Sequence, residues 1–304
     1  MKNIGITGGT GFVGSYLTDA LKKDGYQVVI FTRDPEKHIK KPNTRYAYWC
    51  PEENKCDLTA LKTLNGVINL AGASIAGKRW TSKRKQEIRE SRIIGTQFLV
   101  EKLKEYAPNC STFISASAIG YYGSDNNNEP FKEEDKPAKD FLADTCLKWE
   151  QAAERAADTM RTVLLRFGIV IGKDGGMYKE FAKPIGLGIK PILGSGKQII
   201  SWIQVEDLVR LISASLTNTK ISGAYNAVAP NPVSHEALVQ AIAKQKGGVK
   251  IPVPVPAVAV KLMLGEMSTE VLKSCTVSAQ KVLHTGFQFK YNNIDSAIKA
   301  TVNS

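Results

Sequence analysis

The sequence lacks any hydrophobic run long enough to cross a membrane. Its first residues offer only a short apolar stretch before Gly8, which is also too short for the core of a signal peptide. Histidines number three in 304 residues, and the five cysteines are scattered, with no Cys-x-x-Cys pair. We therefore expect reduced thiols, no metal site, no membrane partner and a cytoplasmic protein.

Acidic residues are outnumbered, with 29 Asp and Glu against 41 Lys and Arg and a net charge of +12. Two basic clusters at 37–41 and 78–85 contribute to this excess, but acidic and apolar residues interrupt or adjoin them, and no aromatic ladder surrounds them. We interpret both clusters as solvated faces and expect no nucleic-acid partner. The charge is compatible with anionic, phosphate-bearing small molecules.

Apolar runs and helical patterns alternate in the first half of the chain. A buried strand at 2–7, a helix at 12–23 and a strand at 27–32 fit a βαβ unit of about 30 residues. Further strands are predicted at 45–49, 66–70, 112–117 and 162–166, and helices at 82–106 and 141–157. This alternation predicts an α/β fold with a Rossmann-type doubly wound parallel sheet.

The pattern changes after Gly168. A glycine-rich stretch leads into SWIQVEDLVRLISASL, a strand or turn followed by a helix, and a short strand is predicted at 225–227. The segment IPVPVPAVAV, with prolines at 252, 254 and 256, is expected to be an extended link into a C-terminal helical piece. We predict a dinucleotide-binding domain at 1–168, to which 203–228 returns, and a smaller C-terminal substrate lobe formed by 169–202 and 229–304.

Three glycines stand between the first predicted strand and helix. Gly8, Gly11 and Gly14 form Gly-x-x-Gly-x-x-Gly, where the backbone has to turn tightly and approach a pyrophosphate. The next strand ends at Thr32 and Arg33, and an arginine there favours the 2′-phosphate of NADP. Asp34 follows and keeps NAD as the less favoured cofactor.

Together with NLAGA at 69–73, these residues resemble the extended short-chain dehydrogenase/reductases, the class that includes sugar-nucleotide epimerases. Further blocks are similar to the atypical branch usually labelled "epimerase family protein", and the likeness runs from residue 1 to 300. These blocks are RW at 79–80, SR at 91–92, SASAIGYYG at 115–123, FLADTCLKWE at 141–150, SWIQVEDL at 201–208 and APNPV at 229–233.

The resemblance implies that the glycine turn holds the pyrophosphate, the end of the second strand the adenosine phosphate, and the loop after Asn69 the adenine and ribose. The candidate cofactor contacts are Gly8, Gly9, Thr10, Gly11, Phe12, Val13, Gly14, Thr32, Arg33, Leu70, Ala71, Gly72, Glu87, Arg92 and Ser115. Arg92 lies where relatives often carry an asparagine that faces the cofactor, which makes it a second phosphate-directed arginine, with Glu87 as its expected partner. An exposed helix pair is the alternative for both.

The chain departs from this class in its chemistry, because the usual Tyr-x-x-x-Lys pair is absent. Alignment on Glu150 puts Leu142 at the tyrosine and Cys146 at the lysine. Ser117 matches the serine that polarises the substrate carbonyl. Tyr121 and Tyr122 are candidate acids, although packing and pocket lining are the favoured interpretation, because a phenol with no adjacent cation keeps a pKa near 10.

Two functions stay open. The favoured one is an NADP-dependent oxidoreductase or epimerase-like enzyme, acting on a small molecule of phosphorylated or nucleotide-linked type. The alternative is a non-catalytic NADP-binding sensor.

Trp202 is either a pocket wall or core, and Glu206 and Asp207 are read as acids at a helix N-terminus. The three histidines are expected on the surface, with no role.

Overall fold

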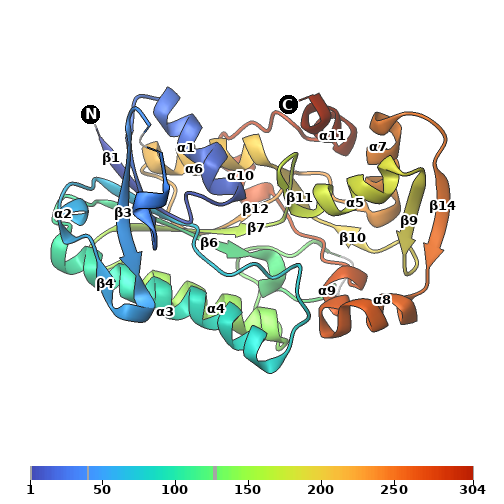
Figure 1. The fold of residues 1–304 in the computed structure, drawn as a ribbon, viewed down its shortest axis with the longest axis horizontal. Helices are drawn as coiled ribbons and strands as arrows, with labels where there is room; N and C mark the ends of the chain where they lie inside the picture. Colours follow the sequence, from blue (N-terminus) through green and yellow to red (C-terminus); the bar gives the residue numbers. More distant parts are fainter. Residues whose placement is uncertain (1, 40, 126–128, 304) are drawn as a thin grey trace.

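The computed structural model describes residues 2–39, 41–125 and 129–303 and is drawn in Figure 1. The strands are β1 (Asn3–Thr7), β2 (Gln27–Thr32), β3 (Thr44–Cys50), β4 (Lys55–Cys56), β5 (Gly66–Asn69), β6 (Thr112–Ala118), β7 (Arg161–Phe167), β8 (Ile169–Gly172), β9 (Ile189–Leu193), β10 (Ile199–Ile200), β11 (Trp202–Gln204), β12 (Gly223–Ala227), β13 (Val233–Ser234) and β14 (Ile251–Val255). The helices are α1 (Phe12–Lys23), α2 (Leu58–Leu61), α3 (Ser82–Tyr106), α4 (Phe141–Glu154), α5 (Gly176–Gly186), α6 (Val205–Thr217), α7 (His235–Lys246), α8 (Ala257–Leu264), α9 (Ser268–Leu272), α10 (Gln280–His284) and α11 (Ile294–Asn303). Single 3-10 turns are η1 (Pro35–Lys37), η2 (Pro51–Glu53), η3 (Ile119–Tyr121) and η4 (Gly265–Met267).

One large sheet organises the molecule. Its order is β12-β7-β6-β5-β1-β2-β3-β4, and neighbouring strands run parallel except for the β3–β4 pair at the edge. The order reverses at β1, the usual arrangement of a doubly wound fold. The predicted Rossmann-type sheet is confirmed, and each strand predicted for it before residue 168 lies within one residue of the observed bounds.

Helices cover both faces of this sheet, as a parallel sheet requires. On one face α1, α6 and α10 pack against the strands through an apolar cluster that includes Leu17, Leu208 and Val282. On the other face α2, α3 and α4 contribute a second cluster that includes Leu61, Leu103 and Ala153 (Figure 1). The loops at the carboxyl ends of the strands are therefore left free for a site.

A smaller lobe follows β7 and occupies the right side of Figure 1. Its apolar core joins α5, α7 and α11 to Trp202 of β11, which runs parallel to β8. The segment expected to be an extended link is β14, a true strand that pairs in parallel with β9. Pro252 and Pro254 are compatible with this role because a strand on the edge of a sheet does not need every N–H group.

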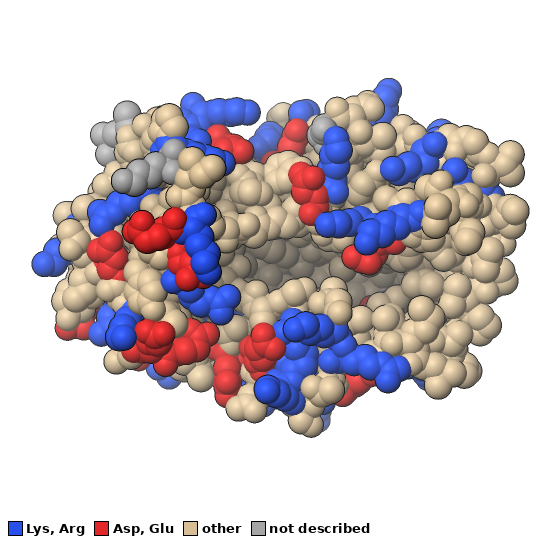
Figure 2. Space-filling view, viewed as in Figure 1, with Lys and Arg blue, Asp and Glu red and all other residues tan. Residues whose placement is uncertain are grey.

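The lobe contacts the half of the molecule that holds the large sheet, and two of these contacts lie on different sides. On one side the Phe12 ring of α1 lies under the turn after β8, and the Tyr16 hydroxyl lies 3.1 Å from the Asp174 carboxylate. On the other side the Lys85 ammonium of α3 lies 2.9 Å from the Glu266 carboxylate of η4. The Arg79 guanidinium also donates to the Met263 carbonyl over 3.2 Å. Between these contacts, the face seen in Figure 2 is hollowed, and lysine and arginine side chains gather along its rim.

Candidate functional site

The glycine turn between β1 and α1 is closed on itself by backbone contacts. Gly8 has φ +70°, and the Gly11 N–H donates to the Gly8 carbonyl over 3.0 Å. A Cβ atom on Gly14 would lie 2.2 Å from the same carbonyl oxygen, so no side chain fits there. Helix α1 begins directly after Gly11 with no side-chain cap and no acid in its first turn. Its first amides are left free to bind an anion.

Two neighbours enclose this turn. Gly8 abuts the loop after β5, since a Cβ atom there would lie 2.8 Å from the Leu70 carbonyl carbon. The Ala71 N–H is held by the Thr7 hydroxyl over 3.3 Å. From the other side Phe12 packs against Gly172 and Gly175 of the second lobe. The predicted turn and the predicted loop are thus side by side, with the second lobe covering the start of α1.

Ser115 belongs to a buried polar network. Its side chain is fully buried, its hydroxyl accepts from the Asn69 amide over 3.2 Å, and it donates to the Ala116 carbonyl over 3.1 Å. Asn69 also donates to the Thr96 hydroxyl over 2.8 Å, and Trp149 donates to the same hydroxyl over 3.0 Å. The structure therefore places Ser115 in a polar network that ties β5, α3 and α4 together.

The end of β2 carries two side chains of opposite charge that are treated differently. Asp34 accepts from the Lys37 ammonium at 3.0 Å. Arg33 is exposed and makes no ion pair with any residue in the described part of the chain. A guanidinium without a counter-ion is thus available at this strand end, whereas the neighbouring carboxylate already has a cation.

Ser117 on β6 is drawn into a buried ion pair. Its hydroxyl donates to the Glu150 carboxylate of α4 over 2.6 Å. That carboxylate receives two hydrogen bonds of 2.8 Å from Arg166 of β7, and both side chains are less than 10% exposed, at 6% and 4%. Because the Ser117 hydroxyl already donates its hydrogen bond to Glu150, it can only accept a hydrogen bond from a ligand.

The two candidate tyrosines surround the same arginine. Tyr122 is buried, and its hydroxyl accepts from Arg166 over 2.8 Å and donates to the Asn226 side chain over 2.7 Å. The Tyr121 ring lies 3.7 Å from the Arg166 guanidinium carbon. Burial raises the pKa of both phenols although this cation lowers it. The expectation that no cation adjoins them is wrong.

Sequence reasoning missed Arg166 as a member of the site and used Glu150 only as a landmark for alignment. A signal was present, because Arg166 interrupts the otherwise apolar strand RTVLLRF. A charge in a buried strand needs a partner. Which partner it has depends on how α4 packs on β7, and the local sequence does not encode that.

Positions 142 and 146 provide no acid and no cation. Leu142 and Cys146 are buried next to Gly120, and burial raises the pKa of the Cys146 thiol to about 12. Lys148 points elsewhere and pairs with Asp144 over 2.9 Å. The absence of the usual pair, predicted from the sequence, is thus not repaired by a nearby lysine.

The expected pair between Glu87 and Arg92 is wrong. The Glu87 carboxylate lies 2.6 Å from Arg84, which holds the pKa of that carboxyl below its usual range. Residues five apart lie on different faces of a helix, so Glu87 turns away from Arg92. Arg92 instead donates to the carbonyls of Ala73 and Ile88, each over 3.0 Å.

Three further residues are placed by the second lobe. Trp202 is fully buried and donates to the Asn231 carbonyl over 2.9 Å, so it is core rather than a pocket wall. Asp207 accepts from the backbone of Lys290 and Tyr291 over 2.9 and 2.8 Å, a structural role for this acid. His235 is 1% exposed, so its predicted place on the surface is wrong.

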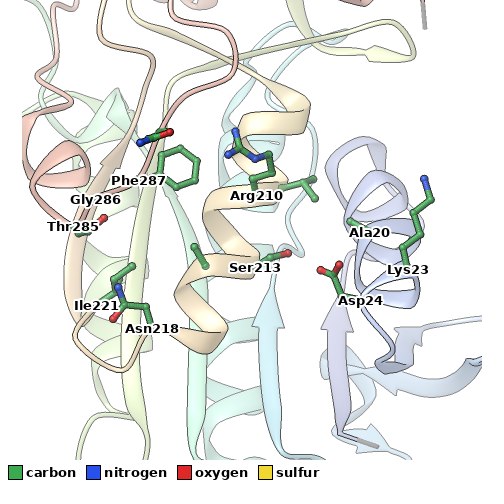
Figure 3. A pocket seen from close by; sticks show the side chains of 13 residues that line it. Ala20, Lys23, Asp24, Arg210, Ser213, Asn218, Ile221, Thr285, Gly286 and Phe287 are labelled. Atoms are coloured by element: carbon green, nitrogen blue, oxygen red, sulfur yellow. The ribbon is translucent and has the colours of Figure 1, made fainter.

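A separate open groove lies away from these residues. It is bordered by the C-terminal end of α1 with Lys23 and Asp24, by Arg210 and Asn218 from α6 and its end, and by Phe287 (Figure 3). The glycine turn precedes α1, whereas this groove adjoins the opposite end of that helix. It contains none of the predicted site residues.

No helix among the described residues combines the length and the apolar character needed to cross a bilayer.

Comparison with known proteins agrees with this geometry. Residues 4–227 match the model of the NAD dependent epimerase/dehydratase family, and residues 255–301 match a domain of unknown function, DUF1731. The chain is 36% identical to the epimerase family protein YfhF of Bacillus subtilis, over 99% of this chain and 98% of that protein. It is 35% identical to the chloroplastic SDR39U1 homolog of Arabidopsis thaliana, over 98% of this chain and 86% of that protein.

Two solved structures illustrate the structural likeness. The human epimerase family protein SDR39U1, crystallised with NADPH, superposes with a TM-score of 0.88 at 26% identity, over 99% of both chains. The UDP-glucose 4-epimerase of Thermotoga maritima, crystallised with UDP-glucose, gives 0.80 at 21% identity, over 99% of this chain and 97% of that chain. The second likeness is one of fold alone.

Proposed function

Because the chain belongs to the NAD dependent epimerase/dehydratase family, we propose that it is an NADP-dependent oxidoreductase or epimerase-like enzyme. Its substrate is a small molecule held between the nucleotide-binding half and the second lobe. One observation carries the cofactor choice: Arg33 is exposed and unpaired within the described chain, while Lys37 occupies the Asp34 carboxylate. A free guanidinium is suited to the 2′-phosphate that distinguishes NADP from NAD.

The remaining cofactor contacts follow from the backbone. The free amides at the start of α1 would bind the pyrophosphate, and the glycines of the turn let it come close. Leu70 and Ala71 would line the adenine and ribose. The presence of NADPH in the crystal of the human relative supports this assignment. When bound, the nicotinamide ring gives or accepts a hydride.

Proton transfer would have to use a group other than the missing tyrosine and lysine. The hydroxyls of Ser117 and Tyr122 already donate hydrogen bonds to the side chains of Glu150 and Asn226. Tyr121 is then the remaining candidate, facing the Arg166 cation at 3.7 Å. Arg166 would stabilise the phenolate that remains after the proton is given up.

A second function, a non-catalytic NADP-binding sensor, is favoured by a specific observation. The hydroxyls of Ser117 and Tyr122 are already used inside the protein, and Leu142 and Cys146 stand where the class places its acid and its cation. Replacement of Tyr121 by Phe separates the two functions. An enzyme loses NADPH oxidation against a panel of small carbonyl compounds, whereas a sensor shows none before or after the change.

Calorimetry with NADPH and NADH tests the cofactor choice. We expect the wild type to prefer NADPH. Arg33→Gln should lower the NADPH affinity about tenfold to a hundredfold, because a charge-assisted hydrogen bond contributes roughly 1.5–3 kcal/mol. Its NADH affinity should stay unchanged. Arg45→Gln, on the neighbouring strand β3 and paired with Asp57, is the matched control. Equal affinities for both cofactors, or no loss in Arg33→Gln, would overturn the choice of NADP.

A further inference from the structure

Arg92 is a half-buried cation on α3, one helical turn before Thr96. Its guanidinium carbon lies 5.2 Å from the centre of the Trp149 ring of α4. One of its terminal nitrogens donates to the carbonyls of Ala73 and Ile88, each over 3.0 Å. The other terminal nitrogen and Nε bond to no residue in the described chain. Only one nitrogen of the guanidinium fork therefore holds the loop after β5.

Three cations that precede Arg92 on α3 have acid partners, whereas Arg92 does not. Arg84 pairs with Glu87 over 2.6 Å, Lys85 with Glu266 over 2.9 Å and Arg89 with Asp144 over 3.0 Å. Within the described residues Arg92 has no such partner. Burial lowers the pKa of its guanidinium, the expected effect when a charge leaves water without a counter-ion. An anion from outside the chain would supply the missing charge.

Gly72 packs closely against the fork. This residue is exposed, and a Cβ atom on it would lie 3.0 Å from the Arg92 guanidinium carbon. The backbone of Gly72 does not need positive φ, so the missing side chain matters here because it makes room for the guanidinium. Any larger residue would press on the fork from the side of the loop.

Position along the loop separates this fork from the pyrophosphate site. The glycine turn abuts Leu70 and the Ala71 nitrogen, whereas Arg92 abuts Gly72 and Ala73, the next residues of the loop. Arg92 also lies close enough to Cys146 for its charge to lower the pKa of that thiol, against the rise caused by burial. Cys146 stands at the position where related enzymes carry a lysine. The fork thus adjoins the substrate side of the site.

We propose that Arg92, backed by Trp149, binds an anionic group of the substrate, a carboxylate or a phosphate, through the two guanidinium nitrogens that the protein leaves free. The proposal rests on the proposed function and narrows its substrate to a small anion. A planar fork matches both oxyanions with two parallel hydrogen bonds. It also supplies a cation near Cys146, the position at which related enzymes carry a lysine.

The test is a titration of the NADPH-saturated protein with inorganic phosphate and, separately, with acetate. Saturation with NADPH fills the pyrophosphate site, so the added anion reports on another one. The signal is the indole N–H resonance of Trp149, assigned with Trp149→Phe. We expect a saturable shift with at least one of the two anions, and its size for each distinguishes phosphate from carboxylate. Arg92→Gln should weaken that binding at least tenfold, while Arg92→Lys retains part of it.

Arg89→Gln is the matched control, since Arg89 also lies on α3 over an aromatic ring, 5.8 Å from the centre of Phe141, but already has an acid. Three results would overturn the proposal: neither anion shifts the resonance, Arg92→Gln binds the anion as tightly as the wild type, or Arg92→Gln loses NADPH affinity as strongly as Arg33→Gln. The last result would assign Arg92 to the cofactor. Failure of the wild type to bind NADPH, seen by calorimetry before any anion is added, would count against the proposed function alone.

Discussion

Two polar regions at the carboxyl end of the sheet differ in whether their charged groups have partners. At the ends of β2 and β5, Arg33 and Arg92 lack acid partners within the described chain, and the first amides of α1 are uncapped. At the ends of β6 and β7, Ser117, Glu150 and Arg166 satisfy one another in a buried cluster. Unpaired groups beside an opening indicate a place for a ligand, whereas a closed cluster indicates a role in holding the fold.

The largest loss of stability should come from removing the carboxylate of the closed cluster around Glu150. Glu150→Ala leaves Arg166 buried without its carboxylate and Ser117 without its acceptor. We expect a loss of about 3–5 kcal/mol in the free energy of unfolding, because removing one partner of a buried ion pair leaves an uncompensated charge. Urea denaturation measures it.

A double variant is the control for this prediction. Glu150→Leu with Arg166→Met replaces both charges by apolar side chains of similar size and should recover most of the stability. A Glu150→Ala protein as stable as the wild type would mean that water reaches Arg166, and the contrast between the two regions would then disappear.

The sequence predicted the open region better than the closed one, for a physical reason. The glycine turn, the strand end at Arg33 and helix α1 are set by residues close together in the chain, and local spacing carries that information. The cluster joins residues 117, 150, 166 and 226 from four elements: the pairing of β6, β7 and β12 aligns 117, 166 and 226, and the packing of α4 adds 150. Local patterns do not contain that packing.

His235 shows the same limit. The polar segment around it predicts an exposed helix start, yet α7 packs against α5, and His235 meets the Phe181 ring with centroids 5.1 Å apart. The segment IPVPV likewise predicts a link, because its partner β9 lies some 60 residues earlier in the chain. In both cases contacts between distant segments override the local preference.

The second predicted effect is a pH dependence of stability that arises from His235, which is buried. Among the described residues neither ring nitrogen of His235 has a hydrogen-bond partner, and burial lowers its pKa from 6.5 to about 4. Between these values the unfolded chain binds the proton and the folded protein does not, so stability falls as the pH drops, by up to about 1.4 kcal/mol per pH unit. Above this window the contribution vanishes.

His235→Leu should remove this dependence. Urea unfolding at neutral pH and at about pH 5 should show a smaller difference for the variant than for the wild type. His284→Gln, an exposed histidine, is the control and should behave as the wild type does. An undiminished acid loss in His235→Leu would assign that loss to other groups and would make His235 accessible to solvent.

The last effect, which should be clearest in cofactor binding, is expected in the open region. Gly14→Ala brings a Cβ atom to 2.2 Å from the Gly8 oxygen and 2.7 Å from the Gly9 Cα, and both are backbone atoms that cannot rotate away. The turn has to shift, at a cost of about 1–3 kcal/mol. Its amides then leave the positions that suit a pyrophosphate. Calorimetry should show a loss of NADPH affinity larger than the modest loss of stability would suggest.

Gly186→Ala is the control for the change in the turn, because Gly186 ends α5 and a Cβ atom there meets nothing within 4 Å. It should keep the wild-type NADPH affinity and the wild-type stability. If Gly14→Ala also binds NADPH normally, the turn tolerates a shifted backbone, and the cofactor would be held by side chains such as Arg33 rather than by the amides of α1. If it loses NADPH while remaining folded, the uncapped start of α1 is the group that the cofactor completes, in contrast to the cluster around Glu150 that needs no ligand.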